Sequence, residues 1–271
     1  MSAIPMKPAM HGYGIRQGHF LANGLVAYWP MWEGSGGRLF DISGKGRHGT
    51  INVGTWTHGP EGHSLDSWSG TSLISVSDSA VTQLPIGGGF SVVILSQIPS
   101  FGANRAVVGW GGTDDLLLYP GEINVGGASN GFRWFWRDAS APTYQPGVPH
   151  NLANDFVNVY ALTCTTGGHQ VAYANNSYSE EDNSIASAGP FNSFRIGGWS
   201  DSAQPYVGRI ASVALYERVL TSSEIAEIVS DPWGLIVPYQ DMYAWSTIAV
   251  AGVARAKINS SLAEGRGSLV A

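Results

Sequence analysis

The chain has little charge, few lysines and one cysteine. Only 13% of its 271 residues are charged, about half of the ~25% that is usual in soluble domains. Three of them are lysines. A coiled coil or helical repeat needs abundant Ala, Glu, Lys and Leu, so this composition excludes both. It also lacks the high charge that accompanies intrinsic disorder. Because Cys164 stands alone, an intrachain disulfide scaffold is excluded.

Long apolar runs are missing as well. The longest uncharged stretch, 79–104, contains two prolines and three successive glycines, which exclude a membrane-spanning helix. Near the N-terminus, Pro5 and Pro8 interrupt the chain and no apolar run follows Lys7, so we expect no secretory signal peptide. We therefore expect a protein that is made in a cytoplasm and is not inserted into a membrane.

Glycine and aromatic residues are abundant instead. The chain has 36 glycines, 10 tryptophans, 11 tyrosines and 9 phenylalanines. This glycine content is nearly twice the average of ~7%. Such a composition favours a large all-β domain, which can reach ~200–250 residues as one unit.

Net charge divides the chain into three segments. Residues 1–23 carry +2, residues 24–233 carry −9, and residues 234–271 carry +1. We predict an extended N-terminal arm (1–23), one folded domain (24–233) and a C-terminal tail (234–271). The acidic domain argues against a nucleic-acid partner, because phosphate contacts need Lys and Arg. The basic ends could dock on an acidic neighbour, or their few charges could have no role.

Short apolar runs with a two-residue period dominate the domain and predict β-strands. They are separated by clusters of Gly, Asn, Asp and Ser, and Thr165–His169 is typical of a hairpin turn because its two glycines tolerate positive φ. The predicted strands are Leu25–Trp29, Phe90–Leu95, Arg105–Trp110, Phe156–Cys164, Gln170–Ala174 and Val207–Tyr216.

One helix is predicted near the end of the domain. Thr221 and Glu224 have the spacing of a capping box, in which each side chain bonds the other residue's backbone amide. Apolar residues then recur at helical spacing, and Asp231-Pro232 ends the pattern. We therefore predict an all-β, two-sheet antiparallel sandwich with one short C-terminal helix. Residues 1–23 show no strand pattern, and the tail has extended or β character.

Two stretches resemble one known family. Gly24–Gly36, with Asp41–Thr50 after it, resembles the opening of the laminin-G-like, concanavalin A-like jelly-roll domains, and Asn192–Trp199 with Gly208–Ala226 resembles their closing strands and helix. The match covers about 24–233 and is weak over 60–155. It implies a jelly roll of two sheets with six or seven strands each. Asp231–Pro238 further resembles the segment that follows this domain in bacteriophage virion proteins.

Some jelly-roll families are glucanases, which place two carboxylates about 5 Å apart on one strand. No Glu-x-Asp-x-x-Glu string occurs, and the adjacent acids Asp114-Asp115 and Glu180–Asp182 would point to opposite faces of a strand. We expect both groups to be solvated charges in turns. Cys164 lies in an apolar strand and predicts a buried, inert thiol. The histidines have no metal-binding spacing. We therefore expect a protein that is not an enzyme.

Lectin-like members of the family bind sugar or calcium at rim loops, and the resemblance suggests candidates for both. Oxygen ligands for calcium are Asp41, Asp114 and Asp115; a turn or cap role is the alternative for Asp41. Sugar-binding candidates are Arg133, Phe135, Arg137, Trp110 and Trp199. The first three share one face of a predicted strand, and the alternative is an ordinary surface strand. Core packing is the alternative for the two tryptophans.

Three functions remain open. The first is a non-enzymatic bacteriophage virion protein, for capsid decoration, adhesion or a head or tail fibre. Its jelly roll would project outward as part of a homo-oligomer, with residues 1–23 and 234–271 bound to other virion proteins. The second is a carbohydrate-binding module that recognises glycans on a host surface. The third is a divergent glycoside hydrolase. The expected location is the virion.

Overall fold

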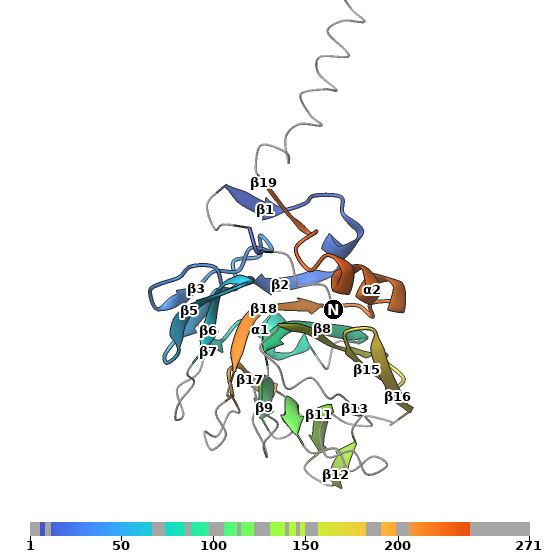
Figure 1. Ribbon diagram of the computed structural model, residues 1–271. Helices are drawn as coiled ribbons and strands as arrows, with labels where there is room; N and C mark the ends of the chain where they lie inside the picture. Colours follow the sequence, from blue (N-terminus) through green and yellow to red (C-terminus); the bar gives the residue numbers. More distant parts are fainter. Residues whose placement is uncertain are drawn as a thin grey trace, which may run out of the picture.

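The computed structural model describes residues 6–8, 12–66, 74–84, 88–97, 106–112, 115–121, 131–138, 141–144, 147–149, 157–182, 191–198, 206 and 208–238. Two large antiparallel sheets lie face to face, and a third layer covers the outward face of one of them (Figure 1). The predicted all-β sandwich is confirmed. The predicted boundaries at residues 24 and 233 stay a prediction.

The sheet beneath the third layer is called the covered sheet. It has eight strands in the order β16-β15-β14-β8-β18-β6-β5, with β2 also paired to β18. Its strands are β2 (Leu25–Trp29), β5 (Thr55–Gly59), β6 (Gly62–Asp66), β8 (Phe90–Gln97), β14 (Asn158–Cys164), β15 (His169–Ala174), β16 (Ser177–Asp182) and β18 (Arg209–Tyr216).

The opposite sheet is called the open sheet. It has nine strands in the order β12-β11-β10-β9-β17-β7-β4-β3, with β13 also paired to β11. Its strands are β3 (Arg38–Leu39), β4 (Gly49–Ile51), β7 (Ile74–Val76), β9 (Val108–Gly112), β10 (Asp115–Gly121), β11 (Gly131–Asp138), β12 (Ala141–Tyr144), β13 (Gly147–Pro149) and β17 (Phe191–Ile196). Both sheets have more strands than the six or seven that the family resemblance implies.

Burial along the strands separates the two sheets. All eight residues of β8 are buried. Val92 and Ile94 pack between the sheets, whereas Val93 and Leu95 pack under the third layer. In β17, partly exposed and buried residues alternate from Ser193 to Ile196. A continuous apolar run thus marks a strand covered on both faces, and alternation marks one that is covered on one face.

The third layer is built from segments near both ends of the chain. It contains β1 (Tyr13–Ile15), the 3₁₀ helix η1 (Phe20–Ala22), α2 (Ser222–Ser230) and β19 (Ile236–Pro238). β1 and β19 pair as a two-stranded sheet, in which Gly14 lies opposite Val237 (Figure 1). Residues 1–23 show no strand pattern in the sequence, and the prediction that they contain no strand is wrong for β1. Three residues are too few to show a periodic pattern, and this strand needs β19 as its partner.

Local sequence signals locate the predicted elements well. All six predicted strands are present, as β2, β8, β9, β14, β15 and β18. The capping box of α2 is confirmed, with the Thr221 Oγ1 accepting from the Glu224 amide and Glu224 accepting from the Thr221 amide at 2.8 Å. A second short helix, α1 (Ser79–Thr82), was not predicted; Asp78 caps it. Among the described residues, no helix has the length and apolarity needed to cross a membrane.

Candidate functional site

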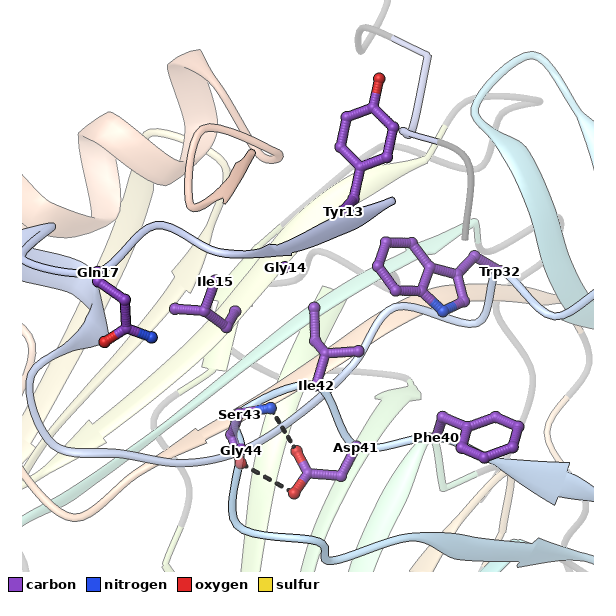
Figure 2. Close-up of a pocket in the computed structure, with 10 residues that line it drawn as sticks. All are labelled: Tyr13, Gly14, Ile15, Gln17, Trp32, Phe40, Asp41, Ile42, Ser43 and Gly44. Carbon is purple, nitrogen blue, oxygen red and sulfur yellow. Dashed lines mark hydrogen bonds between the residues drawn. The ribbon is translucent and has the colours of Figure 1, made fainter. Parts of the chain in front are cut away.

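A slot of about 500 Å³ opens between β1 and the loop 40–44. It is called the β1 slot, and its lining residues are Tyr13, Gly14, Ile15, Gln17, Trp32, Phe40, Asp41, Ile42, Ser43 and Gly44. Figure 2 shows Ile15 and Ile42 approaching each other from the two sides, with the Trp32 ring beside them and Tyr13 pointing away from them. The slot therefore exists only because the N-terminal segment lies on the sandwich.

Asp41 holds the loop side of the β1 slot in shape. Its Oδ1 accepts from the amides of Tyr28 at 3.0 Å and Ser43 at 2.9 Å. Its Oδ2 accepts from the Ser43 hydroxyl at 2.8 Å and the Arg47 amide at 2.9 Å. A carboxylate has about four acceptor sites, so all of them are occupied. The structure favours the turn role of Asp41 over the calcium-ligand role, because no lone pair is left for an ion.

The slot has an apolar floor and one exposed aromatic wall. Trp32 is 4% exposed, whereas Phe40 is 40% exposed. The guanidinium of Arg38 lies 5.2 Å from the centre of the Phe40 ring, and the His48 ring lies edge-on at 5.4 Å. Phe40 is therefore held in place at the surface instead of being buried in the core.

The carboxylate of Glu33 holds the backbone of Phe40 through a hydrogen bond. Its Oε1 accepts from the Phe40 amide at 2.6 Å, and its Oε2 is buried without a hydrogen-bond partner among the described residues. Burial raises the pKa of Glu33, and the hydrogen bond from Phe40 opposes that rise. The carboxyl group therefore acts as a fixed acceptor beneath the wall of the slot.

Lys7 fixes the chain that leads into Trp32. Its ammonium donates to the carbonyl oxygens of Pro30 at 2.6 Å, of Met31 at 3.2 Å and of His63. Met31 is fully buried with a φ of 51°, a backbone conformation that is uncommon outside glycine. By satisfying both carbonyls of this turn, Lys7 stabilises the conformation that presents Trp32 to the slot.

Apart from Asp41, the binding residues predicted from sequence are not among the described residues that line the β1 slot. Trp110 is fully buried and donates its indole N–H to the Val81 carbonyl at 2.8 Å. Its ring lies 4.5 Å from that of Phe194 between the sheets, so Trp110 is a core residue and its prediction as a ligand-binding residue is wrong. The other candidates remain predictions. Arg133, Phe135 and Arg137 lie on β11, Asp115 lies on β10, and Asp114 and Trp199 are outside the described residues.

The described residues contain no cluster of side chains suited to hold a metal ion. No three of their His, Cys, Asp or Glu side chains come together as metal ligands. Cys164 is buried, as predicted, and burial raises the pKa of its thiol to about 12, which disfavours the reactive thiolate. Glu180, Glu181 and Asp182 lie on β16 and Asp115 begins β10, so the expected turns are wrong for these carboxylates.

The β1 slot could not be predicted from the sequence. Tyr13, Trp32 and Phe40 come from three separate segments, and only the packing of β1 brings them together. The one local signal was that Asp41 and Trp32 both lie in the stretches that carry the family resemblance.

Comparison with known proteins identifies the fold but no family. No protein-family model and no curated protein matches the sequence. Domain 4 of a GH43 extracellular arabinanase from Geobacillus stearothermophilus, in complex with arabinotriose, matches with a TM-score of 0.57 and 18% identity over 76% of this chain and 98% of that one. The binding domain of Paraclostridial Mosquitocidal Protein 1 matches with a TM-score of 0.56 and 12% identity, covering 77% of this chain and 52% of that chain.

A Trypanosoma rangeli sialidase in complex with the inhibitor DANA matches with a TM-score of 0.54 and 16% identity over 76% of this chain. The match spans 32% of the sialidase chain, so it concerns one part of that enzyme. At these identities the comparisons establish a shared β-sandwich architecture. They agree with the concanavalin A-like jelly roll that the sequence resembles.

Proposed function

We propose that this chain is a carbohydrate-binding β-sandwich domain whose binding site is the β1 slot. The observation that carries this proposal is the slot itself, with an apolar floor, a fixed and exposed Phe40 and polar groups at its rim. Ligand sites commonly combine apolar and aromatic walls with a few polar groups that orient the ligand. The likeness to an arabinanase domain that holds arabinotriose supports the same function.

The side chains of the slot match the two kinds of surface that a sugar presents. The apolar face of a sugar ring can stack on Phe40, whose ring stays exposed beside Arg38. The side-chain amide of Gln17 makes no hydrogen bond with the described residues and is free to meet sugar hydroxyls. Asp41, already saturated with donors, shapes the loop and does not contact the ligand.

A binding experiment with matched variants tests this proposal. Wild-type protein is applied to a glycan array, and arabinotriose is titrated separately, each with and without calcium. Phe40→Ala should abolish binding to every glycan that the wild type binds. Phe20→Ala is the control, because Phe20 is 49% exposed in η1 and lies outside the slot. The proposal is overturned if the wild type binds no glycan, or if Phe40→Ala binds as well as Phe20→Ala.

We propose binding without hydrolysis. A glycosidase needs an acid and a second carboxylate about 5–9.5 Å apart. Asp41 is the one carboxylate among the residues that line the slot, and its oxygens are occupied. Release of reducing sugar from a bound glycan would contradict this proposal and would support the alternative that the protein is a glycoside hydrolase.

A second proposal concerns the assembly in which the domain acts. β1 and β19 lie side by side at one end of the view in Figure 1, while β11 and β12 of the open sheet lie at the other end. Residues 239–271 follow β19 directly, so attachment through them would leave the open sheet facing outward. This arrangement suits a virion protein that displays its sandwich on a capsid or tail. Deleting 239–271 should abolish incorporation into particles, and normal incorporation of the truncated protein would refute this role.

A further inference from the structure

An arginine that has no counter-ion among the described residues lies near the middle of the open sheet. Arg195 is on β17, between the buried side chains of Phe194 and Ile196. These two neighbours pack into the core between the sheets. Because side chains alternate along a strand, Arg195 lies on the outward face of the open sheet.

Arg195 has no partner among the described residues. It is partly exposed, and its Nε is shielded from solvent without a hydrogen-bond acceptor. No described carboxylate forms an ion pair with it. Other partly buried arginines are paired, since Arg209 lies 3.4 Å from Glu61 and Arg218 lies 2.6 Å from Glu224. A partly desolvated guanidinium without an anion is unusual and calls for an explanation.

The residues beside Arg195 are small and polar. Ser75 on β7 and Gly109 on β9 lie directly opposite it in the two neighbouring strands. Ser193, two residues earlier on β17, lies opposite Gly111 and donates its hydroxyl to the Gly111 carbonyl at 3.2 Å. Asn52 donates to the Ser75 hydroxyl at 3.5 Å. Arg195 thus has serine and glycine as its neighbours in the adjacent strands, and two hydroxyl groups lie near it on this part of the sheet.

The line of paired residues that includes Arg195 continues across the open sheet to β11, the strand that carries the sugar-binding residues predicted from sequence. Gly109 lies opposite Leu117 on β10, and Leu117 lies opposite Phe135 on β11. Arg195 and Phe135 therefore belong to one line of residues across four adjacent strands. This register joins Arg195 to the stretch that was predicted to bind sugar.

We infer that the outward face of β17, centred on Arg195, is a binding site for a sugar that carries a carboxylate. The guanidinium would pair with the carboxylate through its terminal nitrogens. The hydroxyl groups of Ser75 and Ser193 would exchange hydrogen bonds with the sugar hydroxyls. A flat floor of glycine and serine suits a ring, whereas a peptide side chain would need an apolar recess. This site lies in the other sheet from the β1 slot and does not depend on it.

The test uses full-length protein and sugar acids. D-glucuronate, D-galacturonate and N-acetylneuraminate are titrated by NMR, with glucose as the neutral comparison and acetate and phosphate as simple anions. The wild type should bind at least one sugar acid more tightly than glucose, acetate or phosphate. Arg195→Gln should weaken that binding by more than about tenfold, because a charge-assisted hydrogen bond is lost. Arg195→Lys should retain part of the affinity.

Arg16→Gln is the matched control. Arg16 is an exposed arginine next to β1, so this variant makes the same charge change away from the open sheet. It should bind as the wild type does, and Phe40→Ala should also leave sugar-acid binding unchanged. The inference is overturned if the wild type binds none of the three sugar acids, if Arg195→Gln binds like Arg16→Gln, or if acetate or phosphate binds as tightly as the sugar acid.

Discussion

The ammonium of Lys7 donates a hydrogen bond of 2.9 Å to the carbonyl oxygen of Ala211, 204 residues further along the chain. Ala211 lies on β18, in the interior of the covered sheet. The same nitrogen lies within hydrogen-bonding distance of three other carbonyl oxygens, so its three N–H groups are shared among four acceptors. It also lies 5.3 Å from the centre of the Trp233 ring. One lysine thus connects the N-terminal segment, the turn before Trp32 and the covered sheet. These contacts hold the turn that leads into Trp32, on the floor of the β1 slot.

Replacing Lys7 should destabilise the protein. Lys7→Met removes the donor shared by four carbonyl oxygens and leaves them without a partner in a site where Lys7 is 6% exposed. We expect the free energy of unfolding to fall by about 2 kcal/mol or more, measured by urea denaturation. Lys45→Met is the control, because Lys45 is exposed in the loop after Asp41. Equal stability of the two variants would contradict this role.

The stability of the wild type should also depend on pH through Lys7. Burial lowers its pKa from 10.5 to about 7, against the opposing effects of Glu61 and Glu33. Between these two values the unfolded chain holds the proton and the folded chain does not, so stability rises with pH. The slope approaches about 1.4 kcal/mol per pH unit. Urea midpoints from pH 7 to 9 should therefore rise in the wild type, and the rise should be smaller in Lys7→Met.

The capping box of α2 provides a third test. Thr221→Ala removes the hydroxyl that accepts from the Glu224 amide at 3.2 Å, which should cost about 1 kcal/mol. Glu224 also forms a 2.6 Å ion pair with Arg218, and this contact is chiefly responsible for lowering the pKa of Glu224. Ser222→Ala, at the first helical position, is the matched control and should have little effect on thermal unfolding. If both variants lost the same amount of thermal stability, the loss in Thr221→Ala could not be attributed to the capping bond.

Asp41 distinguishes a turn role from a calcium role. Asp41→Asn replaces one acceptor oxygen by an NH₂ group that faces other donors, which should destabilise the protein by about 2 kcal/mol. The four bonds to Asp41 are internal, so this loss should be the same with calcium and with EDTA. If calcium stabilised the wild type but not Asp41→Asn, Asp41 would be a calcium ligand and the turn role would not be sufficient.

Predictions from sequence succeeded where the signal was local. The capping box of Thr221 and Glu224 lies within four residues, and the strand Leu25–Trp29 has the predicted bounds. They failed where a side chain's surroundings come from distant segments. Trp110 beside glycines suggested a rim position, yet Val81 and Phe194 enclose it in the core. β1 escaped detection because its partner strand, β19, lies more than 200 residues away.

By itself, the sequence determined the class of fold, because alternating apolar residues, turn glycines and a helix cap act over a few residues. It also identified a domain without a disulfide scaffold and with a buried thiol at Cys164. The tertiary structure alone decided which of the two sheets the third layer covers. It buried Lys7 among four carbonyls, opened the β1 slot and left Arg195 without an anion among the described residues. These features join residues from separate strands, and their positions depend on how the sheets and the chain ends pack.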